Sequence, residues 1–134
     1  MSNATMENLY LAATADSPEV DFRFDTNELT LKGESYPENA AAFYGSIIKQ
    51  LHDYLASCDE GTTISVNVAL IYFNSSSTKM LFAFFDALNS AAERGVHVVL
   101  NWHYDPEDDT IADFGSELRD DFSALEFRDL PTSE

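Results

Sequence analysis

Apolar and polar residues alternate through the middle of the chain, and the rest of the sequence is organised around this stretch. Every second position from 64 to 72 is apolar or aromatic: Ile64, Val66, Val68, Leu70 and Tyr72. A period of two is typical of a β-strand. Few of the intervening residues look exposed, so we expect a strand that is covered on both faces. Residues 80–92 contain neither proline nor glycine and predict a helix directly after it.

The remaining sequence also divides into segments that alternate like strands and segments with apolar residues at helical spacing. Residues 20–24 and 29–32 alternate around a turn at 25–28 and predict an antiparallel hairpin that ends at Gly33, with a short edge strand at 9–13. Apolar residues at helical spacing predict a first helix that runs to about Ala56 and a third helix through Ile111 and Phe122. Further strands are expected at 96–102 and around 125–127.

Polar residues mark the expected helix ends. Ser35, Pro37 and Glu38 fit a capping box, in which Ser35 caps the first helix and Glu38 bonds back to it. Asp105 is the expected cap of the third helix, because a proline and further acidic residues follow it. Gly95 is expected to end the second helix.

The order of these elements predicts the fold class. Strands that alternate with helices favour right-handed crossovers and a largely parallel sheet, to which the hairpin adds antiparallel strands. We therefore expect a single-domain α/β fold with a mixed sheet over residues 9–128. Residues 1–8 are interpreted as an expression remnant and loose N-terminus, and residues 129–134 as a loose tail.

The chain is strongly acidic. Its 134 residues carry a formal net charge of −17 at pH 7, which argues against binding to nucleic acid or to anionic lipid. No apolar run approaches the length needed to span a bilayer, and no signal peptide is visible. Cys58 is the one cysteine and is read as a small buried hydrophobe. We expect a cytoplasmic protein without a membrane partner.

A run of hydroxyl residues lies between the central strand and the second helix. Asn74 is followed by Ser75, Ser76, Ser77 and Thr78. Asn and Ser can cap a helix by accepting hydrogen bonds from its free amide groups. The same amide groups also favour a phosphate attached to a serine at this position. Both uses remain open.

The second helix carries an aromatic residue outside its buried stripe. Phe82 falls on the polar side, near Ser75, Lys79 and Asp86. An exposed aromatic residue there is typical of a protein-docking patch. Alternatively, the third helix or a loop covers Phe82. Lys79 is one of only seven basic residues and can pair with a phosphate or an acidic partner.

The sequence offers little catalytic chemistry. His97 and His103 share a face of one strand, but no further ligand supports a metal site. The acidic run from Asp105 lacks the glycine and the final glutamate of a calcium loop. Ser75, His103 and Asp105 form a conceivable triad without a nucleophile elbow, and no glycine-rich phosphate loop is present. We expect no enzymatic activity, no metal and no cofactor.

Three segments, 33–39, 72–77 and 102–105, together resemble the SiaC family of bacterial regulatory phosphoproteins. Besides the serine run, the residues that carry the resemblance are Tyr36, Pro37, Glu38, Asn39, Trp102, His103, Tyr104 and Asp105. The resemblance implies a STAS-like fold and a partner switch. In such a switch a dedicated protein kinase and a PP2C-type phosphatase act on one hydroxyl residue. The unphosphorylated form binds and stimulates a diguanylate cyclase, which raises cyclic di-GMP and promotes biofilm.

The resemblance also implies site residues. The acceptor follows the Asn of a Tyr-x-Asn motif and is Ser75 here, where the family often has Thr, with Ser76 and Ser77 as alternatives. The expected partner-binding residues come from the start and the polar face of the second helix rather than from the resemblance: Asn74, Thr78, Lys79, Phe82 and Asp86. Two other hypotheses remain. One is a STAS-like antagonist of an anti-sigma factor. The other is a small hydrolase or ligand-binding domain, which predicts a concave pocket around His103 and Asp105.

Overall fold

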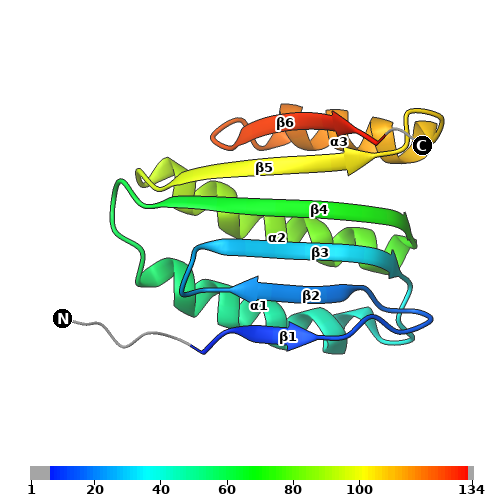
Figure 1. Cartoon of the computed structure of the whole chain (residues 1–134), viewed down its shortest axis with the longest axis horizontal. Helices are drawn as coiled ribbons and strands as arrows, with labels where there is room; N and C mark the ends of the chain where they lie inside the picture. Colours follow the sequence, from blue (N-terminus) through cyan, green and yellow to red (C-terminus); the bar gives the residue numbers. More distant parts are fainter. Residues whose placement is uncertain (1–6, 133–134) are drawn as a thin grey trace.

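The computed structural model describes residues 7–132, which form six strands and three helices (Figure 1). In chain order the elements are β1 (Leu9–Leu11), β2 (Glu19–Arg23), β3 (Glu28–Ser35), α1 (Ala40–Ala56), β4 (Thr63–Phe73), α2 (Ser75–Glu93), β5 (His97–Tyr104), α3 (Asp109–Asp121) and β6 (Glu126–Pro131). The predicted order of strands and helices is confirmed, including the short first strand.

The six strands form one mixed sheet in which spatial order equals chain order, from β1 to β6. β1, β2 and β3 pair antiparallel, whereas β3, β4, β5 and β6 pair parallel. Each crossover connection between parallel strands therefore leads to the next position in the sheet, always in the same direction. Since such crossovers share one handedness, their helices lie on the same face of the sheet. Figure 1 shows all three helices behind the sheet.

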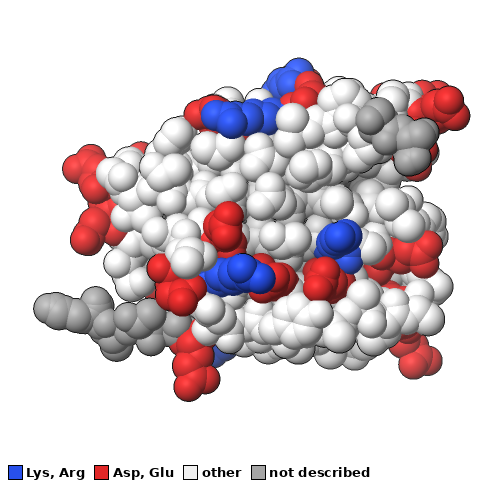
Figure 2. All heavy atoms as spheres, viewed as in Figure 1, with Lys and Arg blue, Asp and Glu red and all other residues white. Residues whose placement is uncertain are grey.

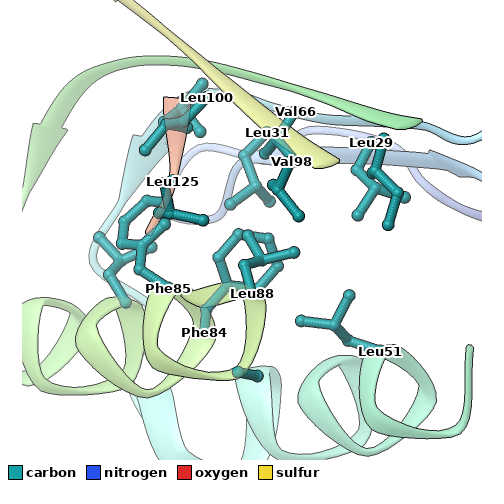
Figure 3. Close-up of a cluster of buried hydrophobic side chains, with 14 of the residues drawn as sticks. Leu29, Leu31, Leu51, Val66, Phe84, Phe85, Leu88, Val98, Leu100 and Leu125 are labelled. Carbon is teal, nitrogen blue, oxygen red and sulfur yellow. The ribbon is translucent and has the colours of Figure 1, made fainter. Parts of the chain in front are cut away.

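The hydrophobic core fills the space between the sheet and these helices (Figure 3). Phe84 and Phe85 of α2 are fully buried and point toward the strands. They face apolar side chains at alternate strand positions, among them Leu29, Leu31, Val66, Val98 and Leu100. The residues predicted to be buried at alternate positions of β4 and β5 are thus confirmed as far as Leu70 and Trp102.

The other face of the sheet is open, so the prediction that β4 is covered on both faces is wrong. Ser65, Asn67 and Ala69 point to this face and are half-buried by neighbouring strands alone. On this face the Asn101 side chain of β5 donates to Oδ1 of Asn67 on β4 at 3.0 Å. Neither β4 nor β5 contains an acidic or basic residue other than histidine. Figure 2 shows this face as largely uncharged over β4 and β5, with charged groups over β2 and β3 and around the rim of the molecule.

The alternation in β4 ends at a β-bulge. Gly33 pairs with Leu70 and Glu34 pairs with Tyr72, so Ile71 has no partner on β3. Gly33 has φ = +120°, a conformation that suits glycine beside the irregular pairing. As a consequence Ile71 and Tyr72 are both exposed, and Tyr72 does not continue the buried series that the sequence predicts.

The predicted capping box of α1 is wrong. Ser35 is the last residue of β3 and is buried, because β3 continues beyond Gly33. The cap of α1 is instead Asn39, whose side chain accepts from the amide of Ala42 at 3.0 Å. Ser35 thus has another role than the sequence predicts, and Asn39 caps the helix in its place. As a result α1 begins later than expected, although it ends at Ala56 as predicted.

The prediction that Asp105 caps α3 is also wrong. Asp108 caps the helix and accepts from the amide of Ile111 at 3.2 Å. Asp105 lies one turn earlier and accepts from the amide of Glu107 at 2.9 Å. Gly95, with φ = +111°, follows the last residues of α2 as predicted.

The two ends of the chain also differ from the predictions. β6 extends from Glu126 to Pro131, so residues 129–131 belong to the sheet rather than to a loose tail. Asp129 pairs with Arg119 of α3, and the amide of Thr132 donates to the Tyr104 carbonyl at 2.7 Å. Most of the predicted remnant, residues 1–6, lies outside the described residues, as do residues 133–134.

Candidate functional site

Three segments singled out in the sequence meet at one edge of the sheet. β3, β4 and β5 are parallel, so their carboxyl ends lie at the same edge, on the right in Figure 1. Segments 33–39, 72–77 and 102–105 lie at the ends of these three strands. The backbone amide of Asn74 donates to the Ser35 carbonyl at 3.1 Å and joins the first two. We therefore treat this carboxyl edge as the candidate site.

The hydroxyl run forms the first turn of α2 rather than a loop before it. Asn74 is the cap, and its side chain accepts from the amide of Ser77 at 2.9 Å. The Thr78 hydroxyl donates to the Asn74 carbonyl at 3.1 Å. Because Asn74 caps the helix, the serines are not needed for that role.

The three serines of this turn differ in their surroundings. Ser75 and Ser76 are exposed, whereas Ser77 is fully buried. The Ser35 hydroxyl donates to Ser77 at 2.8 Å and lies 2.6 Å from the Tyr44 hydroxyl, so these three residues form a buried hydroxyl cluster. Burial raises the pKa of Tyr44 to about 12, and the hydrogen bond with Ser35 opposes that shift. Of the three serines, only Ser75 and Ser76 are accessible to a modifying enzyme.

A hollow of about 380 Å³ lies beside Ser75, between the first turn of α2 and α3. The residues that line this Ser75 hollow are Phe73, Asn74, Ser75, Thr78, Thr110, Asp113, Phe114 and Glu117. The rings of Phe73 and Phe114 are in contact, with centroids 4.7 Å apart. Ser75 therefore borders a hollow that combines aromatic rings with two carboxylates.

Phe82 is covered by α3, as one of the two interpretations of the sequence predicts. Its ring packs edge-on against Phe114, with centroids 5.2 Å apart, and lies 6.1 Å from the ring of Phe122. Phe82 is half-buried and supports the Ser75 hollow through Phe114. Lys79 and Asp86 are exposed on the surface of α2.

The segment at the end of β5 divides into packing and surface residues. Trp102 is 1% exposed, its Nε1 donates to the Ile111 carbonyl at 3.1 Å, and its ring packs against that of Phe114. It therefore holds α3 on the sheet and is not available for contact with a partner. His103 and Tyr104 are half-buried, and Asp105 is exposed.

The segment after β3 divides in the same way. Pro37 is buried and Asn39 caps α1, so both have structural roles. Glu38 is exposed. Tyr36 is 39% exposed and packs edge-on against Tyr72, which is 49% exposed, with ring centroids 5.7 Å apart. This aromatic pair forms a surface feature that the sequence does not reveal.

A second hollow, of about 380 Å³, surrounds His103 and Asp105, as the hydrolase or ligand-binding hypothesis predicts. Its lining residues are Ala69, Leu70, Ile71, His103, Tyr104, Asp105, Asp108, Ile111 and Thr132. No serine belongs to this His103 hollow, and Ser75 lines the other one. The conceivable triad of Ser75, His103 and Asp105 is therefore not gathered around one hollow.

The other histidine of β5 lies at the opposite end of the strand. His97 Nε2 is 2.6 Å from Oε1 of Glu126, and this hydrogen bond lowers the pKa of the Glu126 carboxyl. Within residues 7–132, no three His, Cys, Asp or Glu side chains are grouped as metal ligands. Over the same range, every helix is too short or too polar to cross a bilayer.

Comparison with known proteins gives consistent matches. A sequence model described as SiaC family regulatory phosphoprotein matches residues 11–132. An uncharacterized protein of Pseudomonas aeruginosa (strain UCBPP-PA14) is 31% identical over 118 residues, which cover 88% of this chain and 92% of that protein.

Solved structures agree. Apo-SiaC from Pseudomonas aeruginosa has a TM-score of 0.84 and 30% identity, covering 93% of this chain and 99% of that chain. The crystal structure of the diguanylate cyclase SiaD in complex with its activator SiaC, from the same organism, gives a TM-score of 0.84 and 29% identity, with 92% and 99% covered. Since the family match spans almost all of the described residues, this chain belongs to the SiaC family of regulatory phosphoproteins.

Proposed function

We propose that this chain is a non-enzymatic regulator that binds and activates a diguanylate cyclase, and that phosphorylation of Ser75 prevents the binding. One observation carries the proposal. The chain shares its fold, over 92% of its length, with a protein solved in the complex of the cyclase SiaD with its activator SiaC. In this proposal a protein kinase adds the phosphate and a PP2C-type phosphatase removes it, so that cyclic di-GMP and biofilm formation follow the phosphorylation state.

The accessibility of the serines supports Ser75 as the acceptor. Ser75 is exposed and is the first residue of α2 after its cap. Free amide groups and the dipole at a helix N-terminus stabilise a phosphate there. Ser77 has to leave the buried hydroxyl cluster before a kinase can reach it. Ser76 is exposed but does not line the Ser75 hollow.

The surroundings of Ser75 support the proposal that a phosphate there weakens binding. A phosphate adds nearly two negative charges and occupies part of the Ser75 hollow, beside Asp113 and Glu117. A partner side chain that enters the hollow then has to displace the phosphate's water, which costs binding free energy. We propose that Asn74, Thr78, Lys79 and Asp86 form the surrounding contact surface, while Phe82 contributes through its packing on Phe114.

The test measures cyclic di-GMP formation by purified SiaD of Pseudomonas aeruginosa with and without this chain. The wild type and Ser75→Ala are expected to raise the rate, whereas Ser75→Asp at the same concentration gives at most about a tenth of the stimulation. Ser76→Asp is the matched control, because it adds the same charge one residue further along α2 and outside the hollow. It is expected to stimulate like the wild type.

Two outcomes contradict the proposal separately. If the wild type does not stimulate the cyclase at any concentration, the chain is not an activator of this cyclase class. If Ser75→Ala and Ser75→Asp stimulate equally, the chain is an activator but Ser75 is not its switch.

A further inference from the structure

The hollows at the carboxyl edge adjoin one another. A third hollow, of about 170 Å³, shares Ile71, Asp108 and Ile111 with the His103 hollow. It shares Phe73 and Thr110 with the Ser75 hollow. The resulting carboxyl-edge groove runs from His103, past the N-terminus of α3, to Ser75.

The wall of this groove carries exposed apolar side chains. Ile71 is 66% exposed and Tyr72 is 49% exposed, and the ring of Tyr36 packs against that of Tyr72. The β-bulge causes this exposure, because it interrupts the alternation that otherwise turns one of two adjacent side chains toward the core. Ile71 therefore lies uncovered on the groove wall, although its removal from water is favourable.

The groove is lined by acidic side chains. Asp105, Asp108, Asp113 and Glu117 lie along it, and no Lys or Arg lines any of its three hollows. The whole chain is acidic as well, with a net charge of −17. A complementary occupant therefore combines apolar side chains with Lys or Arg.

We infer that the carboxyl-edge groove is the docking site for a segment of the cyclase in which apolar side chains are flanked by basic ones. The inference rests on the proposed function and specifies the chemistry of its partner. The segment lies over Ile71, places one apolar side chain in the Ser75 hollow, and pairs its basic side chains with the carboxylates of the groove. A phosphate on Ser75 attracts these basic side chains, but it occupies the hollow that the apolar side chain needs, and in this inference the lost burial outweighs the attraction. A phosphate on Ser75 fills only one end, so the end at Ile71 and His103 is open in both forms.

The first test introduces a positive charge at Ile71. Ile71→Lys is expected to weaken the binding of purified SiaD at least tenfold, measured by titration calorimetry with the complete unphosphorylated chain. Leu11→Lys is the matched control, since Leu11 is also an exposed aliphatic residue but lies on β1, far along the sheet from the groove. Its binding is expected to stay within twofold of the wild type. Equal thermal unfolding temperatures show that neither variant acts through the fold.

The second test examines the charge complementarity. The double variant Asp113→Asn and Glu117→Gln is expected to weaken binding at least threefold and to reduce the dependence of affinity on salt. Asp120→Asn is the control, because Asp120 is exposed on the same helix but does not line the groove. An affinity of the double variant equal to or higher than that of the wild type overturns the basic character of the occupant.

The outcomes separate this inference from the proposed function. If Ser75→Asp abolishes binding while Ile71→Lys leaves it unchanged, the switch stands and the groove is not the docking site. If both variants weaken binding and Leu11→Lys does not, the inference is supported. If the wild type does not bind the cyclase, the proposed function fails and the inference fails with it.

Discussion

The buried hydroxyl cluster permits a quantitative prediction for Ser35→Ala. The Ser35 hydroxyl bonds to both Tyr44 and Ser77, and all three residues are fully buried. The substitution therefore removes the partner of two buried hydroxyls. A buried polar group left without a partner costs about 1–3 kcal/mol. The Ser77 hydroxyl can turn to a carbonyl one helical turn earlier, so its share is smaller. We expect a total loss of about 2–4 kcal/mol.

The assay is urea unfolding followed by tryptophan fluorescence, with the free energy of unfolding obtained by linear extrapolation. Such a loss is a large part of the total stability of a domain, about 5–15 kcal/mol. Tyr36→Phe is the control, because it removes a tyrosine hydroxyl at an exposed position, and it is expected to change stability by less than about 0.5 kcal/mol.

A double-mutant cycle sharpens this test. If Ser35→Ala and Tyr44→Phe remove the two ends of one hydrogen bond, the double variant loses less stability than the sum of the two single losses, by about 1 kcal/mol. A loss below about 1 kcal/mol for Ser35→Ala, with an unchanged denaturant slope, would refute the reasoning that these hydroxyls depend on one another.

Two further predictions concern packing and pH. A Cβ added by Gly115→Ala lies 2.6 Å from Nε1 of Trp102, so we expect a loss of about 1–3 kcal/mol in thermal unfolding. Gly45→Ala on α1, where a Cβ meets nothing within 4 Å, is expected to gain about 0.5–1 kcal/mol, and equal losses in both variants contradict the argument. The pKa of Tyr44 is raised from 10.0 to about 12 in the folded state. The contribution of Tyr44 to the free energy of unfolding is therefore complete below pH 10. It falls by up to about 3 kcal/mol as the pH rises to 12. Tyr44→Phe is expected to reduce this loss of stability between pH 10 and pH 12. An unchanged pH dependence of the free energy of unfolding contradicts the prediction.

The elements of the fold were predictable because burial imposes a period on the sequence. Alternate positions of β4 and β5 lie under α2 and α3, and the sequence marks them with large apolar residues such as Val66 and Leu100. The open face was not predictable in the same way. Asn67 and Ala69 fit a covered position as well as an uncovered one, and only the one-directional crossovers leave that face without helices.

The candidate site was predictable only in part. Ser75 follows a strand and begins a helix, and both features are visible in the sequence. The sequence wrongly predicts Ser35 to be a helix cap, because its partner Ser77 lies 42 residues further along the chain and no local pattern indicates that contact. The cover of Phe82 likewise depends on where α3 packs, which the sequence of α2 does not contain.

The coincidence of strand order and chain order has a consequence for the synthesis of the protein. No strand inserts between two earlier ones, so each strand can join the sheet in the order in which it leaves the ribosome. Every pairing closes a loop that contains at most one helix, which keeps the entropy lost at each step small. Until the last strand arrives, the growing sheet presents an unpaired edge. β6 then ends this growth, because Arg128, Asp129 and Pro131 are exposed along it and oppose the addition of a strand from another molecule.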